Sequence, residues 1–264
     1  MPGFQLKITK VFKEKSHNYV GRIVYPDDAS FLFEVPTYIH VDRLKKWHRY
    51  SWHQLCAWMW SGSEDKQIRP YTFCILNDWV AGQLFIVSKD APFDNSKEVP
   101  GAKYGKQPSF RFEVFDFNGD DLSNGKVITI FSVLNFSRDS RQSQNREKDS
   151  NFVDWIRRRF MPYGEVVAVK PFYSPRHQRL IMPKFEVFLG RQRCKFAYYA
   201  GPVVFQIRIP EPNREQFLLR LINGVGHGRA FGFGALLPVM IDDQVLPYVN
   251  DRLRECIVNS LSIE

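Results

Sequence analysis

The chain has 264 residues, of which 44% are hydrophobic and 15% aromatic, enough to bury a substantial core and to exclude global disorder. Its formal net charge of +9 favours a polyanionic partner, with nucleic acid ahead of a membrane surface. No run of about 18 apolar residues occurs, and the N-terminus, MPGFQLKITKVFKEK, is too charged for a signal peptide, so no membrane partner is expected.

In the first half, a helix is expected among several strands. Strands are predicted at 4–12, 18–25, 30–41, 69–76, 81–88 and 110–117. The helix begins after Asp42, where apolar residues recur at helical spacing. The stretch 90–109 is rich in Pro, Gly, Lys and Ser and predicts a loop insertion.

The second half follows a simpler order of elements. Strands are predicted at 126–136, 165–173, 195–209 and 235–241, and helices at 151–164, 211–224 and 244–261. Up to residue 241 the order is strand, helix, strand, strand, helix, strand, the βαββαβ pattern of a ferredoxin-like (RRM-like) domain. The first half fits the same plan with an N-terminal hairpin extension. We therefore expect an α+β protein of two tandem ferredoxin-like domains, 1–125 and 126–264, with a C-terminal helical tail.

Four cysteines, at positions 56, 74, 194 and 256, are scattered in apolar contexts without metal-ligand spacing. This usage predicts reduced, buried thiols in a cytoplasmic protein and no zinc site. No cofactor is expected.

Five glycines fall within Gly224–Gly234 around a single cation, Arg229, in the sequence GVGHGRAFGFG. A dinucleotide fingerprint is excluded because the third glycine is missing from its position and because the loop follows a helix instead of opening one. A P-loop is excluded because no Lys follows at the required spacing. The composition favours a loop whose backbone amides an anion can approach closely, although helix capping and a turn would also use glycine.

This run, with the helix before it and the strand after it, resembles the C-terminal signature of CRISPR repeat-processing endoribonucleases of the RAMP (repeat-associated mysterious protein) superfamily. The signature has the form G-h-G-x-x-[KR]-x-x-G-x-G, and its fixed positions are occupied by Gly224, Val225, Gly226, Arg229, Gly232 and Gly234. The resemblance covers about 126–240. It implies two ferredoxin-like domains and metal-independent cleavage of precursor CRISPR RNA at the base of the repeat stem-loop. It also implies that the protein stays bound to the mature crRNA and meets other subunits of an effector complex.

A second match concerns the first half, where one branch of the family carries a Tyr and a His three residues apart on the first helix. Tyr50 and His53 have this arrangement, which implies that His53 is a general acid or base and Tyr50 its partner, with Arg229 in support. His48 on the same helix is the main alternative to His53. Charge stabilisation by Arg43, Arg22 or Arg229 without a histidine also remains open. The long N-terminal stretch, the insertion and the C-terminal tail suggest a divergent subtype, with a type IV CRISPR system as a candidate source.

The strongest candidates for RNA contacts are cations of the second half. The helix at 151–164 carries Arg157, Arg158 and Arg159, and the preceding polar run carries Arg138, Arg141 and Arg146. The resemblance implies that this basic helix lies along the RNA stem, where contacts to phosphates read mainly shape. The glycine loop adds Gly224, Gly226, His227, Arg229, Gly232 and Gly234 as RNA-binding candidates. The alternative is a non-catalytic RAMP subunit that binds guide RNA, because the glycine loop occurs in both classes.

Overall fold

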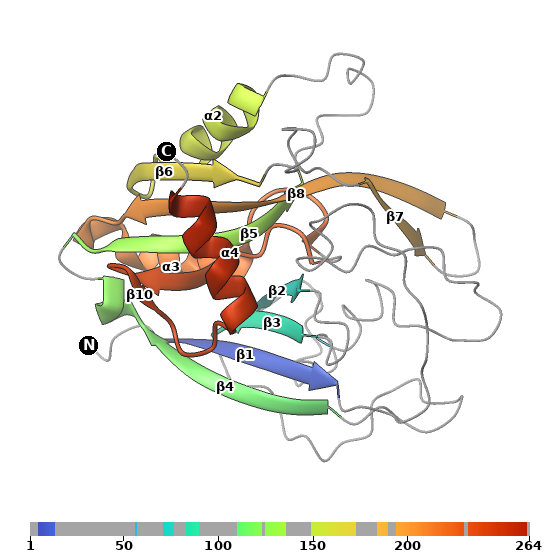
Figure 1. The fold of residues 1–264 in the computed structure, drawn as a ribbon, viewed down its shortest axis with the longest axis horizontal. Helices are drawn as coiled ribbons and strands as arrows, with labels where there is room; N and C mark the ends of the chain where they lie inside the picture. Colours follow the sequence, from blue (N-terminus) through green and yellow to red (C-terminus); the bar gives the residue numbers. More distant parts are fainter. Residues whose placement is uncertain are drawn as a thin grey trace.

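The computed structural model describes residues 5–13, 56, 71–76, 83–89, 110–122, 125–135, 149–172, 184–189, 194–229 and 232–262. Within them the chain forms two antiparallel sheets with helices packed against them, as expected for an α+β protein (Figure 1). None of the described helices is long and apolar enough to cross a bilayer.

The first sheet contains β1 (Gln5–Lys13), β2 (Tyr71–Leu76), β3 (Gln83–Ser88) and β4 (Phe110–Asn118), in the order β2-β3-β1-β4. All its pairings are antiparallel. Alternation of apolar and polar residues explains its two faces, since Phe117 is buried while Asp116 and Val114 are exposed. Cys56, which lies between β1 and β2 in the sequence, is helical and buried, where a βαββαβ unit has its first helix.

The N-terminal strand differs from its expected role. β1 pairs with β3 on one side and with β4 on the other, so it is a central strand of the sheet and not half of an added hairpin. Its sequence alone could not reveal this, because both neighbours lie at least 70 residues further along the chain. The strands predicted at 18–25 and 30–41 lie outside the described residues.

The second sheet has the order β10-β9-β5-β8-β6 and is built from β5 (Val127–Asn135), β6 (Glu165–Pro171), β8 (Cys194–Arg208), β9 (Leu237–Ile241) and β10 (Gln244–Val245). β7 (Lys184–Leu189) pairs with the first half of β8. The helices are α2 (Asp149–Phe160) and α3 (Arg214–Asn223), the latter preceded by the 3-10 turn η2 (Glu211–Asn213). With β10 and β7 set aside, the order β9-β5-β8-β6 is the ferredoxin-like one, so this expectation is confirmed.

The C-terminal segment begins differently from the helix expected at 244–261. Asp242 (φ 44°) and Asp243 (φ 65°) turn the chain back so that β10 pairs with β9. The helix, α4 (Asp251–Ser262), starts only after Asn250, whose Oδ1 accepts a hydrogen bond of 2.8 Å from the Leu253 amide and caps it.

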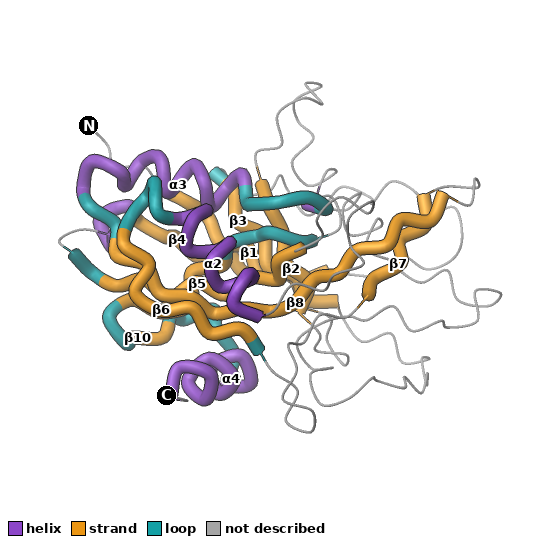
Figure 2. Tube along the Cα trace, turned by 90° about the horizontal axis from the view of Figure 1, so that it is seen from above, coloured by secondary structure: helices purple, strands orange, loops and turns teal. Residues whose placement is uncertain are grey.

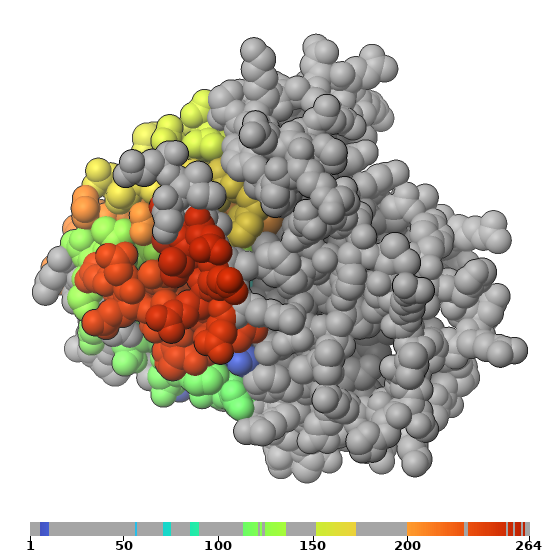
Figure 3. Space-filling model, in the orientation of Figure 1, coloured from blue at the N-terminus to red at the C-terminus, as the bar shows by residue number. Residues whose placement is uncertain are grey.

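α4 covers the side of the second sheet opposite to α3 (Figures 1 and 2), where it packs against β6 and β8. Its residues Leu253 and Ile257 are buried. In the space-filling view the C-terminal segment, in red, occupies the surface between the second sheet and β4 (Figure 3). At β6 and β8, therefore, this face is no open platform on which RNA bases could stack.

A single core connects the two sheets. Leu6, Ile8 and Phe85 of the first sheet belong to the same buried cluster as Phe131 and Phe205 of the second. The loop before α4 contributes Tyr248, whose ring lies 6.2 Å from that of Phe85 and 5.5 Å from that of Phe115. Its hydroxyl donates a 2.6 Å hydrogen bond to the Pro238 carbonyl. The two sheets thus share buried apolar area, which stabilises their packing.

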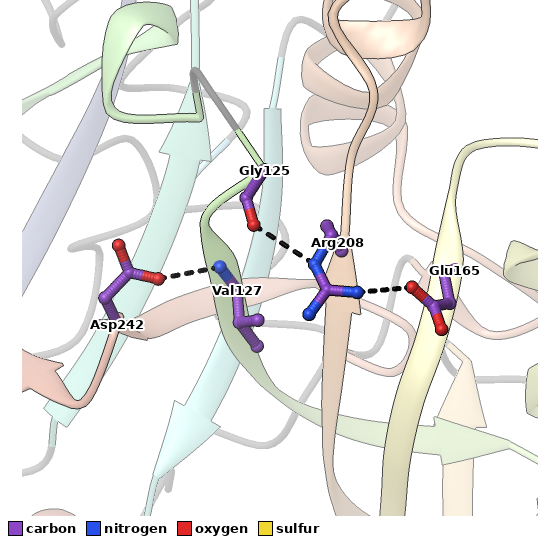
Figure 4. A network of polar contacts seen from close by, with 5 residues as sticks. All are labelled: Gly125, Val127, Glu165, Arg208 and Asp242. Carbon is purple, nitrogen blue, oxygen red and sulfur yellow. Dashed lines mark hydrogen bonds and ion pairs between the residues drawn. The ribbon is translucent and has the colours of Figure 1, made fainter.

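A polar network fixes the start of β5, just after Gly125 (Figure 4). Arg208, at the end of β8, donates from Nε to the Gly125 carbonyl at 3.1 Å and pairs through Nη1 with Glu165 of β6. Asp242 accepts a 2.8 Å hydrogen bond from the Val127 amide. All described strands of the first sheet precede Gly125 and all those of the second follow it, which supports our proposal of a domain boundary at 125/126.

Candidate nucleic-acid interface

The last turn of α2 presents three cations to solvent. Phe152, Ile156 and Phe160 recur at spacing four and are buried, which leaves Arg157, Arg158 and Arg159 exposed. Arg157 contacts Asp154 at 3.9 Å, but both side chains are more than half exposed, so this pair contributes little to stability. Cations in the last turn also complement the negative C-terminal end of the helix dipole. The helix thus places positive charge on the surface, as predicted from the sequence.

The turn after α2 brings this basic end against α3. Asn213, directly before α3, donates from Nδ2 to the carbonyls of Pro162 and Tyr163 at 3.3 and 3.2 Å. The Tyr163 ring lies 6.2 Å from the ring of Phe217 on α3. Polar and apolar contacts therefore fix the end of α2 beside α3.

The glycine-rich loop starts at the C-terminus of α3 with a tightly closed neck, which is formed by Gly224, Val225 and Gly234. Gly224 has φ 62° and its amide donates to the Arg220 carbonyl at 2.8 Å, which caps the helix. The Val225 amide donates to the Gly234 carbonyl at 2.8 Å, and the Gly234 amide to the Val133 carbonyl of β5 at 2.8 Å. At this neck the glycines are required by backbone geometry, and their amides are already used within the protein.

The top of the loop is different. Gly226 and Gly228 have φ 74° and 81°, and His227 is exposed. Among the described residues, the amides of 226–229 have no hydrogen-bond acceptor. Among the described residues of the loop, only this part, which we call the crown (residues 226–229), therefore offers the free amides that the sequence suggested for the whole loop. Asn135 of β5 holds the crown by donating from Nδ2 to the His227 carbonyl at 3.4 Å.

Arg229 folds back on the helix that precedes the loop. Its Nη1 donates a 2.7 Å hydrogen bond to the Asn223 carbonyl, the last residue of α3, while the side chain stays exposed. This bond uses one of its five N–H groups, and the rest have no acceptor among the described residues. Arg229 thus has a structural contact that sequence reasoning missed, and it retains donors for a ligand.

Arg220 is a further cation that sequence reasoning missed. It lies in the last turn of α3, half-buried, with its Cζ 5.9 Å from the centre of the Tyr163 ring. Burial lowers the pKa of its guanidinium, the Tyr163 hydroxyl opposes this, and the positive charges of Arg159 and Arg229 lower it further. The only signal in the sequence was a cation between the apolar residues of an amphipathic helix, which usually marks a solvated position.

Other predicted site residues cannot be placed in this way. Eight of them lie outside the described residues: Tyr50, His53, His48, Arg43, Arg22, Arg138, Arg141 and Arg146. The described residues thus bring together the end of α2, the end of α3 and the glycine loop, which form a basic surface without a described catalytic histidine. The guanidinium groups and free backbone amides of this surface are hydrogen-bond donors of the kind that anions accept from.

Solved structures share this fold. CRISPR endoribonuclease Cse3 bound to a 19-nucleotide RNA matches with a TM-score of 0.56 and 13% identity, over 89% of this chain and 99% of that chain. Thermus thermophilus Cse3, bound to an RNA representing a pre-cleavage complex, matches with a TM-score of 0.54 and 16% identity, over 90% of this chain and 100% of that one. A chain of a CRISPR RNA-guided surveillance complex in a pre-nicking state matches with a TM-score of 0.50 and 15% identity, over 88% of this chain and 98% of that chain.

At these identities the likeness concerns the fold. No protein-family model matches the sequence, and no curated protein sequence does so either. The tandem ferredoxin-like architecture expected from the order of elements is thereby confirmed along most of the chain.

Proposed function

We propose that this chain is a metal-independent endoribonuclease that cleaves precursor CRISPR RNA at the base of the repeat stem-loop. The observation that carries the proposal is the fold, which extends over 99% of RNA-bound Cse3 and has a glycine-rich loop between α3 and β9. The exposed cations of α2 beside that loop support an RNA ligand. The chain would work in the cytoplasm.

The reaction uses the RNA's own 2′-hydroxyl as nucleophile. Its oxygen attacks the adjacent phosphorus while a base takes its proton, and the bond to the 5′-oxygen breaks as an acid protonates that oxygen. The products are a 2′,3′-cyclic phosphate and a 5′-hydroxyl. We assign the acid or base role to His53, with Tyr50 as its partner on the helix and Arg229 stabilising negative charge; His48, Arg43 and Arg22 are the alternatives.

RNA binding falls to the second domain in this proposal. Arg157, Arg158 and Arg159 contact phosphates along the stem, and Arg138, Arg141 and Arg146 extend that surface. In the glycine loop, the crown residues Gly226, His227 and Arg229 contact the RNA backbone, whereas Gly224, Gly232 and Gly234 determine the conformation of the loop. Phosphate contacts that survive cleavage would keep the mature crRNA bound for an effector complex.

Cleavage of a labelled CRISPR repeat hairpin in EDTA tests the proposal. We expect the wild-type protein to cut once at the base of the stem, and His53→Ala to reduce the rate by 100-fold or more, on the order of what a general acid or base contributes. A 2′-deoxy nucleotide at the cut site should block the reaction. His48→Ala and Arg229→Ala, measured in parallel, separate the alternative assignments.

Tight binding of the hairpin without any cutting would overturn the proposed enzymatic activity and favour a non-catalytic RAMP subunit that holds guide RNA. The likeness to a chain of a surveillance complex is the observation behind that second candidate. Full activity of His53→Ala together with inactivity of His48→Ala would move the catalytic role along the same helix.

A further inference from the structure

Three arginines lie on three elements that come together, α2, α3 and the glycine loop. Arg159 lies in the last turn of α2, Arg220 lies in the last turn of α3, and Arg229 belongs to the crown of the loop. We propose that Arg159, Arg220 and Arg229 together bind one phosphate of the RNA backbone, which ties the stem-binding helix to the glycine loop. This inference rests on the proposed function, because it takes RNA as the source of the phosphate.

The position of Arg220 is fixed by its surroundings. Its guanidinium lies over the ring of Tyr163, at 5.9 Å, and Tyr163 belongs to the turn that follows Arg159 by four residues. Asn213 and Phe217 hold that turn against α3. The end of α2 therefore cannot move away from Arg220 without breaking these contacts.

The position of Arg229 is fixed by the helix end. Its 2.7 Å hydrogen bond to the Asn223 carbonyl keeps the guanidinium at the C-terminus of α3, one turn after Arg220. The crown amides at 226–229 lie on the same loop and have no acceptor among the described residues. A phosphate at this point would meet guanidinium and backbone donors together, as anions do in nests of backbone amides.

The charges of the three arginines are not balanced within the described part of the chain. None of them forms an ion pair with a described carboxylate. The ion pairs of the described acids involve other cations: Asp154 contacts Arg157, Glu165 contacts Arg208, and Asp120 and Glu211 contact Arg214. The buried Nε of Arg220 also has no hydrogen-bond partner among described residues.

Burial and nearby positive charge both disfavour the charged form of Arg220. Burial lowers the pKa of its guanidinium, and repulsion by the charges of Arg159 and Arg229 lowers it further. A negative ligand among them would remove this repulsion, and its phosphate oxygens could accept from several guanidinium groups at once. The alternative is that Arg220 only packs on Tyr163 and Arg229 only caps α3.

The first test measures repeat-hairpin affinity at several salt concentrations for Arg159→Gln, Arg220→Gln, Arg229→Gln and the triple variant. Arg254→Gln is the matched control, since it removes one exposed cation from α4 on the opposite side of the sheet. We expect each single change to weaken binding about 10-fold, as for a lost hydrogen bond to a charged group. Arg254→Gln should stay within about 2-fold of wild type.

The salt dependence separates one shared phosphate from three separate ones. A shared phosphate predicts that the slope of log K against log salt falls by about 1 in the triple variant, and that the three single effects are not additive. A fall of about 3 with additive effects means three separate phosphates and overturns the inference. A slope and affinity equal to wild type overturn it as well.

A second test needs no RNA. Inorganic phosphate should raise the Tm of the wild-type protein above its value in chloride of equal ionic strength, and this increment should vanish in the triple variant but persist in Arg254→Gln. Because the increment is taken within each variant, a change in basal stability does not mimic it. Phosphate stabilisation that needs the three arginines, without binding of any RNA, would support the anion site and overturn the proposed function. If phosphate raises the Tm of the wild-type protein and of the triple variant equally, or raises neither, the proposed site is overturned.

Discussion

Gly224 and Gly234 face each other across the neck of the glycine-rich loop, so closely that neither position can hold a side chain. A Cβ on Gly224 would lie 2.6 Å from the Gly234 carbonyl oxygen, and a Cβ on Gly234 would lie 1.8 Å from the Val225 carbonyl oxygen. Both residues also have positive φ, 62° and 76°. The neck therefore depends on glycine for space and for backbone conformation at the same time.

Replacing a neck glycine should cost stability, whereas replacing a crown glycine should cost mainly RNA affinity. Gly234→Ala should lower the free energy of unfolding by at least about 3 kcal/mol, because the backbone must move away from Val225. Among the described residues, a Cβ on Gly226 would meet only the Asn135 carbonyl oxygen, at 3.7 Å, so the cost of Gly226→Ala is the φ strain of about 1 kcal/mol. Urea unfolding measures the loss of stability in both variants. Equal losses for the two variants would contradict this division of the loop.

That division explains which part of the candidate site the sequence could predict. The five glycines and Arg229 stood out as a loop, and their order identified its place between a helix and a strand. The distinction between neck and crown depends on Val133 and Asn135 of β5, which are distant in sequence and carry no pattern that points to the loop. The role of Arg220 likewise depends on Tyr163, 57 positions before it and on another element.

The fold was easier to predict from the sequence than the site, because the periodicity of apolar residues is a local property of the chain. The strands β5, β6, β8 and β9 and the helices α2 and α3 were predicted at nearly their observed positions, whereas β7 was not predicted. β10 was mistaken for the start of a helix, since a two-residue strand has no periodicity and its turn uses two aspartates at positive φ. The central place of β1 was missed because strand order is set by long-range pairing.

Two buried threonines of the first sheet should respond in opposite ways to loss of their hydroxyls. Thr72 donates a 3.0 Å hydrogen bond to the Leu221 carbonyl at the end of α3, which has no helical partner there. Thr72→Val should therefore lower the free energy of unfolding by about 1 to 2 kcal/mol. Thr9 Oγ1 is buried without a partner among the described residues, so Thr9→Val should be neutral or stabilising. A destabilising Thr9→Val with a neutral Thr72→Val would refute the assignment.

The thiol of Cys56 should make stability fall at alkaline pH. Complete burial raises the pKa of Cys56 well above its ordinary value, because the thiolate would lose its solvation. In the unfolded chain the thiol releases its proton near pH 8.5, so above that pH the folded state holds more protons than the unfolded state. Its contribution is complete below about pH 8 and is lost as pH rises, with a slope of up to about 1.4 kcal/mol per pH unit.

The comparison of wild type with Cys56→Ala measures this effect. The variant is less stable at neutral pH because of the cavity, but its free energy of unfolding should fall less steeply between pH 8.5 and 10. Thiol reagents at pH 8 should leave Cys56 unlabelled in the native protein and label it in urea. Parallel pH profiles for the two proteins would show that Cys56 does not titrate differently in the folded state.

Arg158 should contribute to RNA binding through charge and not through sequence recognition. It is exposed in the last turn of α2 and has no ion-pair partner among the described residues, so Arg158→Gln should leave the free energy of unfolding within about 0.5 kcal/mol. Its loss should reduce the salt slope of hairpin binding by about 1, the value for one phosphate contact. Because A-form stems are read by shape, the affinity should fall by the same factor for hairpins with unrelated stem sequences. Fluorescence anisotropy with two such hairpins at several salt concentrations measures this, with Arg254→Gln as the control. A loss confined to one stem sequence would mean that Arg158 reads a base edge instead.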